Sequence, residues 1–223
     1  MCFCAGASFA ASAGLALIGV TAQRLVTTPH QRMFATIPLL FAIQQAAEGV
    51  VWLTVNNPSQ KMLTLIGVYT FLTFAFIVWP FWIPFSVSLM ERTRKRKSLL
   101  QGISLLGVGL SLFLGWLLVK HGAQASIVNN SIYYDVMRPA GYVEPLIFLY
   151  TVTTIVPFFI VLMRGASLFG FLAVASFIAA YSIWKTNFIS VWCFFAALIS
   201  IGVLVVLYWR HQDNKHYNAP LNN

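Results

Sequence analysis

Seven long apolar blocks divide this chain and constrain its fold more than any other feature. They cover approximately residues 5–26, 33–54, 62–89, 98–119, 144–163, 166–184 and 188–209. A helix of about 20 apolar residues spans the hydrocarbon core of a bilayer, where exposed backbone N–H and C=O groups find no partner in the lipid. We therefore predict an all-α integral membrane protein, a seven-transmembrane-helix bundle in one domain (residues 1–209) with a cytoplasmic tail at 210–223.

Composition supports this fold class. Only 9% of the residues are charged and the mean hydropathy is +0.80, whereas a soluble domain carries about 25% charged residues. The blocks lack the strict alternation of a membrane barrel. The net charge of +9 lies in short breaks between blocks rather than along one surface, so we expect membrane lipid as a partner and no nucleic acid. Prolines at 80, 84 and 157 predict kinks in the third and fifth blocks.

The basic residues predict an orientation. Cytoplasmic loops are enriched in Lys and Arg, and one side of the predicted bundle carries most of them: Arg24, Arg32, Arg92, Arg94, Lys95, Arg96, Lys97, Arg164, Arg210 and Lys215. The other side carries Lys61, Lys120, Arg138 and Lys185. This predicts an N-terminus outside and a C-terminus in the cytoplasm. The run at 91–97 is either a topology anchor or a binding segment for anionic lipid headgroups or an acidic partner.

The one long loop, 120–143, is expected on the outer side. Two short β-prone runs flank Asn129 and Asn130, and Asn tolerates the positive φ of a tight hairpin turn. A small β-hairpin that covers a cavity between helices and an irregular connector remain alternative interpretations.

Glu48 is the candidate site residue that the pattern selects first. It is the one acidic residue inside an apolar block, where a carboxyl group needs polar neighbours or a bound proton. Gln44 and Gln45 lie four and three positions earlier, on the same helix face, and Trp52 follows one turn later. This stripe favours a ligand, proton or ion site in the outer half of the bundle, and an interhelical hydrogen-bonded clamp is the structural alternative.

The cysteines form a second candidate site. Cys2 and Cys4 precede the first helix, and Cys193 lies near the outer start of the seventh, so the three thiols are expected near the level of Glu48. A disulfide, soft-metal binding and simple packing are all open. The sequence assigns no cofactor, no catalytic residue and no oligomeric state.

The motifs around these residues are similar to a known family. The start Met-Cys-Phe-Cys-Ala, the stretch Gln-Gln-Ala-Ala-Glu-Gly at 44–49 and Ser-Val-Trp-Cys at 190–193 resemble bacterial membrane proteins of unknown function. Members begin Met-Cys-Phe-Ser-Ala and carry Gln-Gln-x-x-Glu-Gly in the second span. The resemblance implies a bacterial cytoplasmic (inner) membrane and adds Trp192 to the site. Cys4 stands where the family has serine, which argues against a role specific to Cys4.

Three functions follow as hypotheses. The first is a transporter-like or receptor-like protein that handles a small ligand or ion in an outer polar cavity with Glu48, Gln44 and Gln45. The second is a membrane-embedded enzyme with a cysteine thiol as nucleophile and Glu48 as acid or base. The third is a scaffold subunit whose polar stripe contacts a partner helix.

Overall fold

The computed structural model describes residues 4–136 and 143–217. Cys2, Arg138 and the last residues of the predicted tail, 218–223, lie outside the described residues. Within them, seven helical segments are long and apolar enough to cross a membrane, which confirms the predicted seven-helix bundle. The segments are Ala5–Arg24, Pro29–Thr54, Pro58–Met90, Arg94–His121, Val143–Ile160, Ala166–Ile183 and Phe188–Gln212.

Several of these segments consist of more than one regular element. The elements are α1 (Ala5–Arg24), η1 (Pro29–Gln31), α2 (Arg32–Ala35), α3 (Ile37–Thr54), η2 (Pro58–Gln60), α4 (Lys61–Thr73), η3 (Phe74–Val78), α5 (Trp79–Met90), α6 (Arg94–His121), β1 (Ala123–Val128), β2 (Ser131–Val136), α7 (Val143–Thr154), α8 (Pro157–Ile160), α9 (Ala166–Ile183), α10 (Phe188–Ile199) and α11 (Gly202–Tyr217).

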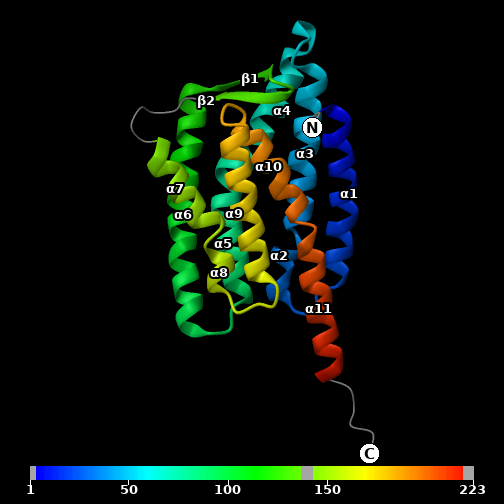
Figure 1. Cartoon of the computed structure of the whole chain (residues 1–223), viewed down its shortest axis with the longest axis vertical. Helices are drawn as coiled ribbons and strands as arrows, with labels where there is room; N and C mark the ends of the chain where they lie inside the picture. Colours follow the sequence, from blue (N-terminus) through cyan, green and yellow to red (C-terminus); the bar gives the residue numbers. More distant parts are fainter. Residues whose placement is uncertain (1–3, 137–142, 218–223) are drawn as a thin grey trace, which may run out of the picture.

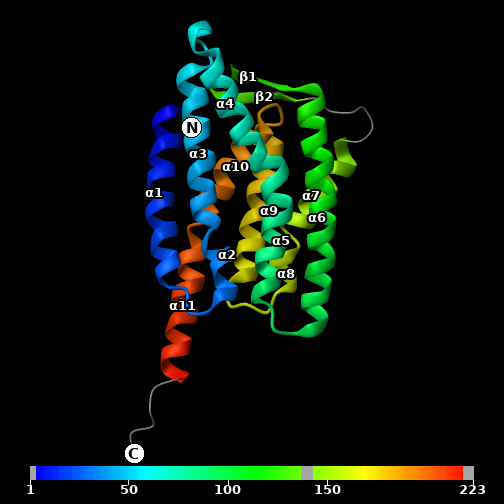
Figure 2. The same cartoon turned by 180° about the vertical axis from the view of Figure 1, so that it is seen from behind.

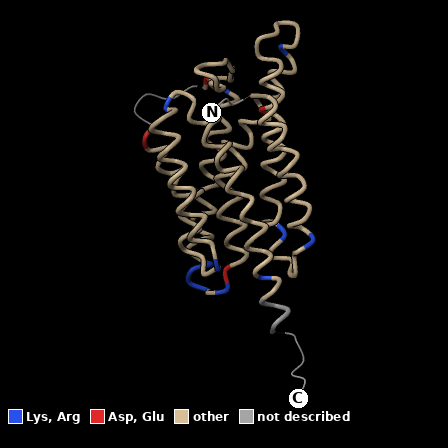
Figure 3. Tube along the Cα trace, turned by 45° about the vertical axis from the view of Figure 1, so that its right-hand side comes forward, with Lys and Arg blue, Asp and Glu red and all other residues tan. Residues whose placement is uncertain are grey.

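Successive segments run in opposite directions along one elongated bundle (Figures 1 and 2). The hairpin β1–β2 lies across one end, which we call the hairpin end, and α11 leaves the bundle at the opposite end, the tail end. Figure 3 shows Lys and Arg at these two ends, with the middle of the bundle almost free of them. This distribution is the one expected if the middle is the part that contacts lipid.

Small residues allow α1 to pack closely on α3. A Cβ added to Gly19 would lie 2.5 Å from the Leu39 side chain, and one added to Gly49 would lie 2.7 Å from the Phe9 ring. The Ser12 hydroxyl donates to the Ala42 carbonyl, 2.8 Å away. Small residues and hydroxyl groups at such contacts are typical of helix pairs in membranes.

Pro80 and Pro157 lie at interruptions of regular α-helix, as predicted, whereas Pro84 lies inside the continuous helix α5. The π-helical turn η3 precedes Pro80, and the break between α7 and α8 precedes Pro157. Trp79 donates its backbone N–H to the Phe74 carbonyl, and Pro80 has no N–H to offer the next carbonyl, that of Ala75. The Tyr150 hydroxyl of α7 donates to this Ala75 carbonyl instead, at 2.6 Å. A side chain from another helix therefore satisfies the carbonyl that the proline leaves open.

The predicted hairpin is confirmed. β1 and β2 pair antiparallel, with Val128 opposite Ser131, and Asn129 and Asn130 adopt φ values of 49° and 57° at the turn. Ile132 and Tyr134 of β2 are buried among the bundle helices. The hairpin therefore contributes to the core and covers the hairpin end of the bundle.

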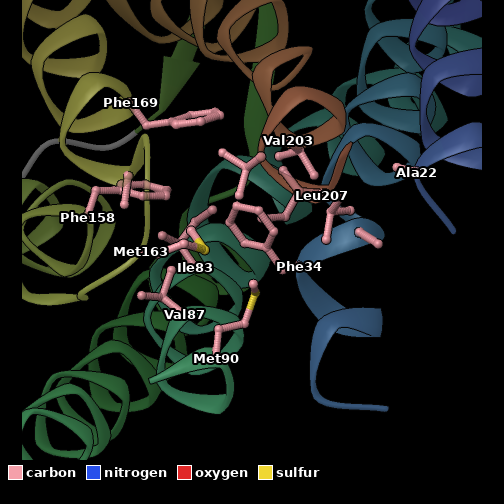
Figure 4. Packing of buried hydrophobic residues seen from close by; sticks show 14 of the residues in the cluster. Ala22, Phe34, Ile83, Val87, Met90, Phe158, Met163, Phe169, Val203 and Leu207 are labelled. Carbon is pink, nitrogen blue, oxygen red and sulfur yellow. The ribbon is translucent and has the colours of Figure 1, made fainter. Parts of the chain in front are cut away.

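The largest hydrophobic cluster fills the tail-end half of the bundle. Figure 4 shows Phe34 of α2 among side chains of α5, α11 and the segment between α8 and α9, including Ile83, Val203 and Met163. Phe34 is completely buried. The candidate site lies outside this cluster, around the buried polar residues Gln44, Gln45 and Glu48 of α3.

Candidate functional site

The polar stripe of α3 faces the inside of the bundle. Gln44 and Gln45 are fully buried, and Glu48 is 2% exposed. Spacings of three and four residues place all three on one side of the helix, which is the side that packs against α4 and α10. The stripe lies in the hairpin-end half of the segment Pro29–Thr54, which ends next to the hairpin end.

Glu48 is bound by a hydroxyl group from the last of the seven apolar segments. The Ser190 hydroxyl of α10 donates to Oε1 of Glu48, with 2.5 Å between the two oxygens. The two residues are 142 positions apart in the sequence. A buried carboxyl without a hydrogen bond would cost several kcal/mol, so this contact is a condition for placing Glu48 in the interior.

Gln44 connects α3 to the irregular third segment. Its Oε1 accepts a hydrogen bond from Nε1 of Trp79 at 2.8 Å, and its Nε2 donates to the Phe71 carbonyl at 3.4 Å. Trp79 also stacks on Phe41, with 3.9 Å between ring centroids. Gln44 therefore has a structural role with defined partners on both sides of η3.

Gln45 and Tyr134 contribute polar atoms that have no hydrogen-bond partner among the described residues. Both polar atoms of the Gln45 amide and the Tyr134 hydroxyl are buried in this state. Gln45 lies beside the Glu48 carboxyl, and Tyr134 lies near both Glu48 and Cys193. We call Gln44, Gln45, Glu48, Tyr134 and Ser190 the polar cluster. Unsatisfied buried polar atoms are rare in folded proteins and mark places where a water molecule or ligand group binds.

Cys193 lies beside the polar cluster. It is buried, and the Glu48 carboxyl and the Gln44 amide are its polar neighbours. Ser190 and Cys193 share one face of α10 because they are three residues apart. Cys193 is not in a disulfide, and neither is Cys4, which is exposed at the start of α1. The structure thus brings Cys193, and not Cys4, to Glu48. Cys2, the third predicted thiol, lies outside the described residues.

The two tryptophans of the predicted site lie in different surroundings. Trp192 is buried, stacks on Phe188 at 5.4 Å and meets the edges of Phe177 and Tyr150. Its indole N–H has no partner among the described residues. Trp52 is partly buried and packs between the two hydrophobic clusters at the hairpin end. Trp192, and not Trp52, lines the cavities described below.

A cavity of about 280 Å³ lies on the other side of Cys193. It is formed between α6, α7, α9 and α10, and its wall is mainly apolar and aromatic, including Tyr150, Phe177, Tyr181, Phe188, Trp192 and Cys193. Glu144 and Lys185 add charge where α7 begins and α9 has ended. We call this space the hairpin-end cavity. Glu48, Gln44 and Gln45 do not line it; they lie behind Cys193.

A second, smaller cavity of about 80 Å³ lies deeper in the bundle. It shares Tyr150, Trp192 and Cys193 with the hairpin-end cavity and is otherwise lined by residues such as Phe41 and Trp79. The three shared side chains therefore separate the two spaces. A rotamer change in one of them would connect the spaces, since buried side chains do exchange rotamers.

Sequence reasoning missed Ser190 and Tyr134 as members of this arrangement, whereas Tyr150 was a candidate cavity residue of the fifth block. Ser190 lies in the same motif as Trp192 and Cys193, and its spacing of three from Cys193 was a usable signal. Tyr134 and Tyr150 come from the hairpin and from α7, and no spacing in the sequence connects them to Glu48.

Metal ligands are not grouped in the described part of the chain. No set of three or more His, Cys, Asp or Glu side chains there has the geometry to hold a metal ion. The oxygen atoms of Glu48, Gln45, Ser190 and Tyr134 are hard donors, which suit a proton, a water molecule or an alkali cation better than a soft metal.

Comparison with known proteins places these features in a family. No curated protein and no solved structure matches the chain. One family model matches almost all of it, from residue 1 to residue 220, and therefore includes every element of the polar cluster and the cavity. The chain belongs to this family, DUF6629, a family of unknown function.

Proposed function

We propose that this protein is a receptor-like or transporter-like protein of the bacterial cytoplasmic membrane that binds a small, mainly apolar molecule in the hairpin-end cavity. The N-terminus and the hairpin face outward, so the ligand enters from outside. The excess of Lys and Arg at the tail end supports this orientation. Residues 1–209 form one membrane domain, and 210–223 form the cytoplasmic tail.

The shape and chemistry of the cavity support a small apolar ligand. Its volume is close to the lower end of small-molecule sites, about 300 Å³. Phe177, Phe188 and Trp192 offer aromatic faces to the space. A small ligand with an apolar body suits such a wall.

One observation carries the proposal: a single turn of α10 contributes to both the polar cluster and the cavity wall. Ser190 holds Glu48, while Trp192 and Cys193 line the cavity. A ligand that shifts this turn changes the hydrogen bond to Glu48, and a change at Glu48 shifts the cavity wall. Such reciprocal coupling is what a proton-linked or ion-linked carrier or receptor requires.

A thiol enzyme is the second candidate, because Cys193 lines the cavity. A reactive cysteine needs a thiolate, which a neighbouring cation or helix N-terminus stabilises. The neighbours of Cys193 are instead a carboxyl group and an amide, and burial adds to the cost of the thiolate. These surroundings favour ligand binding over nucleophilic catalysis. A scaffold subunit, the third hypothesis, needs no cavity at all.

The experiment uses Cys193 as a reporter. In purified protein with Cys2 and Cys4 replaced by serine, the rate of modification by N-ethylmaleimide is followed by intact mass. Because its surroundings disfavour the thiolate, we expect Cys193 to react slowly but measurably in the folded protein, and benzyl alcohol to slow the reaction further by occupying the cavity. Ile147→Trp, which fills the cavity from α7, should slow it at least about tenfold.

Leu112→Trp is the matched control. Leu112 belongs to α6 and is 70% exposed, so the same bulk is added outside the cavity. Its labelling rate should equal that of the parent. The proposal fails if Cys193 reacts only after denaturation, or if benzyl alcohol and Ile147→Trp leave the rate unchanged. Retention of benzyl alcohol binding in Cys193→Ala, measured by calorimetry, would separate binding from thiol chemistry.

A further inference from the structure

A third cavity, whose wall is charged rather than apolar, lies at the tail end of the bundle. It has a volume of about 660 Å³ and is formed by segments that are distant in sequence: the α1–η1 connection and η1, the end of α5 with the loop to α6, the α8–α9 connection, and α11. The charged residues and the histidine in its wall are His30, Glu91, Arg92, Lys97, Arg164 and Arg210. We call this space the tail-end cleft.

The single carboxylate among the described residues of the cleft is already engaged. Glu91 is 5% exposed and accepts backbone N–H groups of Arg92 at 2.9 Å, Thr93 at 2.7 Å and Leu162 at 2.8 Å. Both of its oxygens are used in these bonds. Four cationic side chains thus face one carboxylate whose hydrogen-bonding capacity is largely taken by the backbone. The cleft therefore carries a positive potential.

Hydrogen bonds connect the segments that carry the basic side chains of the cleft. Glu91 ties the loop before α6 to Leu162, and Nη1 of Arg96 donates to the Ile160 carbonyl at 3.0 Å, which links the same two segments. The Arg164 guanidinium lies over the Trp209 ring, 5.1 Å from its centroid. The contact with Trp209 positions the Arg164 side chain, which lowers the entropic cost of binding an anion there.

Gly165 makes the arrangement at Arg164 possible. It adopts a φ of +83°, and an added Cβ would lie 2.9 Å from the Trp209 ring. Only glycine adopts this backbone conformation without strain. The turn therefore lets Trp209 approach the chain and places Arg164 at the cleft beside Arg210, which follows Trp209 on α11.

We propose that the tail-end cleft binds a phosphate-type oxyanion. Arginine presents a planar fork of N–H groups that matches two phosphate oxygens, and lysine adds a point charge. Arg92, Lys97 and Arg164 approach the cleft from different segments, so they contact such an anion from several directions. The phosphate belongs either to the headgroup of an anionic lipid or to a soluble phosphate compound. This inference is independent of the ligand in the hairpin-end cavity.

The test uses the full chain and separates the two sources. In phosphatidylcholine nanodiscs, sodium phosphate should raise the thermal midpoint above that in sodium chloride of equal ionic strength if the ligand is soluble. If the ligand is a lipid, phosphatidylglycerol should be retained over phosphatidylcholine, as measured by native mass spectrometry. Lys97→Gln and Arg164→Gln should each weaken the effective probe about tenfold or more, because hydrogen bonds to charged groups contribute about 1.5–3 kcal/mol.

Lys95→Gln is the matched control, since Lys95 lies two positions from Lys97 in the same basic run but is exposed and does not line the cleft. It should bind the probe like the parent. Arg164→Lys keeps the charge and reports on folding separately from binding. The proposal is overturned if neither probe binds, or if Lys95→Gln weakens binding as much as Lys97→Gln, because the effect would then be a diffuse one of surface charge.

Discussion

At the scale of single residues, Glu48 shows how this bundle accommodates a carboxyl group. Its described hydrogen-bond donor is a neutral hydroxyl, that of Ser190, and no Lys or Arg of the described residues lies in the interior beside it. A neutral partner compensates an ionised carboxylate only in part. A bound proton or cation would complete the compensation, as the proposed proton-linked or ion-linked function requires.

Substitutions at Glu48 separate the hydrogen bond from the charge. Glu48→Gln keeps an acceptor oxygen for Ser190, so we expect the free energy of unfolding to fall by less than about 1 kcal/mol. Glu48→Ala leaves the Ser190 hydroxyl without its partner and should cost about 1–3 kcal/mol more. Unfolding of the purified protein by sodium dodecyl sulfate, followed by circular dichroism, measures both. Equal losses for the two variants would show that the charge, and not the hydrogen bond, stabilises this site.

Glu91 predicts a dependence of stability on pH. Burial disfavours its ionised form, but the N–H groups of Leu162, Thr93 and Arg92 outweigh this and hold the pKa of the carboxyl below its usual value of 4.5. Because the pKa is depressed in the folded state, the stabilisation is complete above the unfolded pKa and is lost as the pH falls through the lower folded value. The thermal midpoint of the parent should therefore fall more steeply below about pH 4.5 than that of Glu91→Gln. Parallel pH profiles would contradict this.

The sequence was sufficient for the inner face of α3 but not for its partners. Residues three and four positions apart on a helix share a face whatever the fold, so Gln44, Gln45 and Glu48 were predictable as one stripe. Ser190 is 142 residues away from Glu48, and Tyr134 reaches the site from a hairpin. These contacts depend on which helices are neighbours, and hydropathy fixes the length of a span but not its neighbours.

At the scale of elements, the contact between α5 and α6 depends on one glycine. The Pro80 carbonyl approaches α6 so closely that a Cβ added to Gly107 would lie 2.0 Å from its oxygen. Next to this contact, the Ser111 hydroxyl donates to the Ile77 carbonyl at 2.7 Å. The helical hydrogen bonding of the proline-rich segment is interrupted, and close packing against α6 stabilises this segment. The sequence predicted an interruption here, because proline lacks an N–H, but it did not identify the helix that compensates for it.

Alanine substitutions in α6 test this contact with an internal control. Gly107→Ala should destabilise the protein by about 1–3 kcal/mol, because backbone and not a flexible side chain must move. Gly109→Ala, two positions away with nothing within 4 Å of the added Cβ, should be neutral or stabilising by up to about 1 kcal/mol, since alanine favours the helix. Thermal unfolding of the purified variants measures the difference. A neutral Gly107→Ala would mean that α5 and α6 are not in close contact.

At the scale of the whole molecule, the two ends of the bundle differ in kind. The hairpin end is closed by a two-stranded lid, held by the Asn187 amide, whose Nδ2 donates to the Val128 carbonyl and to the Ser131 hydroxyl. The tail end carries the basic cleft. An apolar cavity with a buried carboxyl at one end and an oxyanion site at the other gives each side of the membrane its own ligand chemistry, provided that the bundle has the proposed orientation.

Thiol labelling tests this orientation directly. Cys4 is exposed at the hairpin end, so in a Cys2→Ser background a membrane-impermeant maleimide should label it in intact spheroplasts, while buried Cys193 reacts far more slowly. In a second protein with Cys2 and Cys4 replaced by serine, Lys95→Cys places a thiol in the first turn of α6 at the tail end and should be labelled only after lysis. The expectation follows from the cost of moving a cluster of Lys and Arg across the bilayer, which retains them in the cytoplasm. The opposite labelling pattern would place the hairpin-end cavity on the cytoplasmic side, and the ligand would then be a molecule of the cell interior.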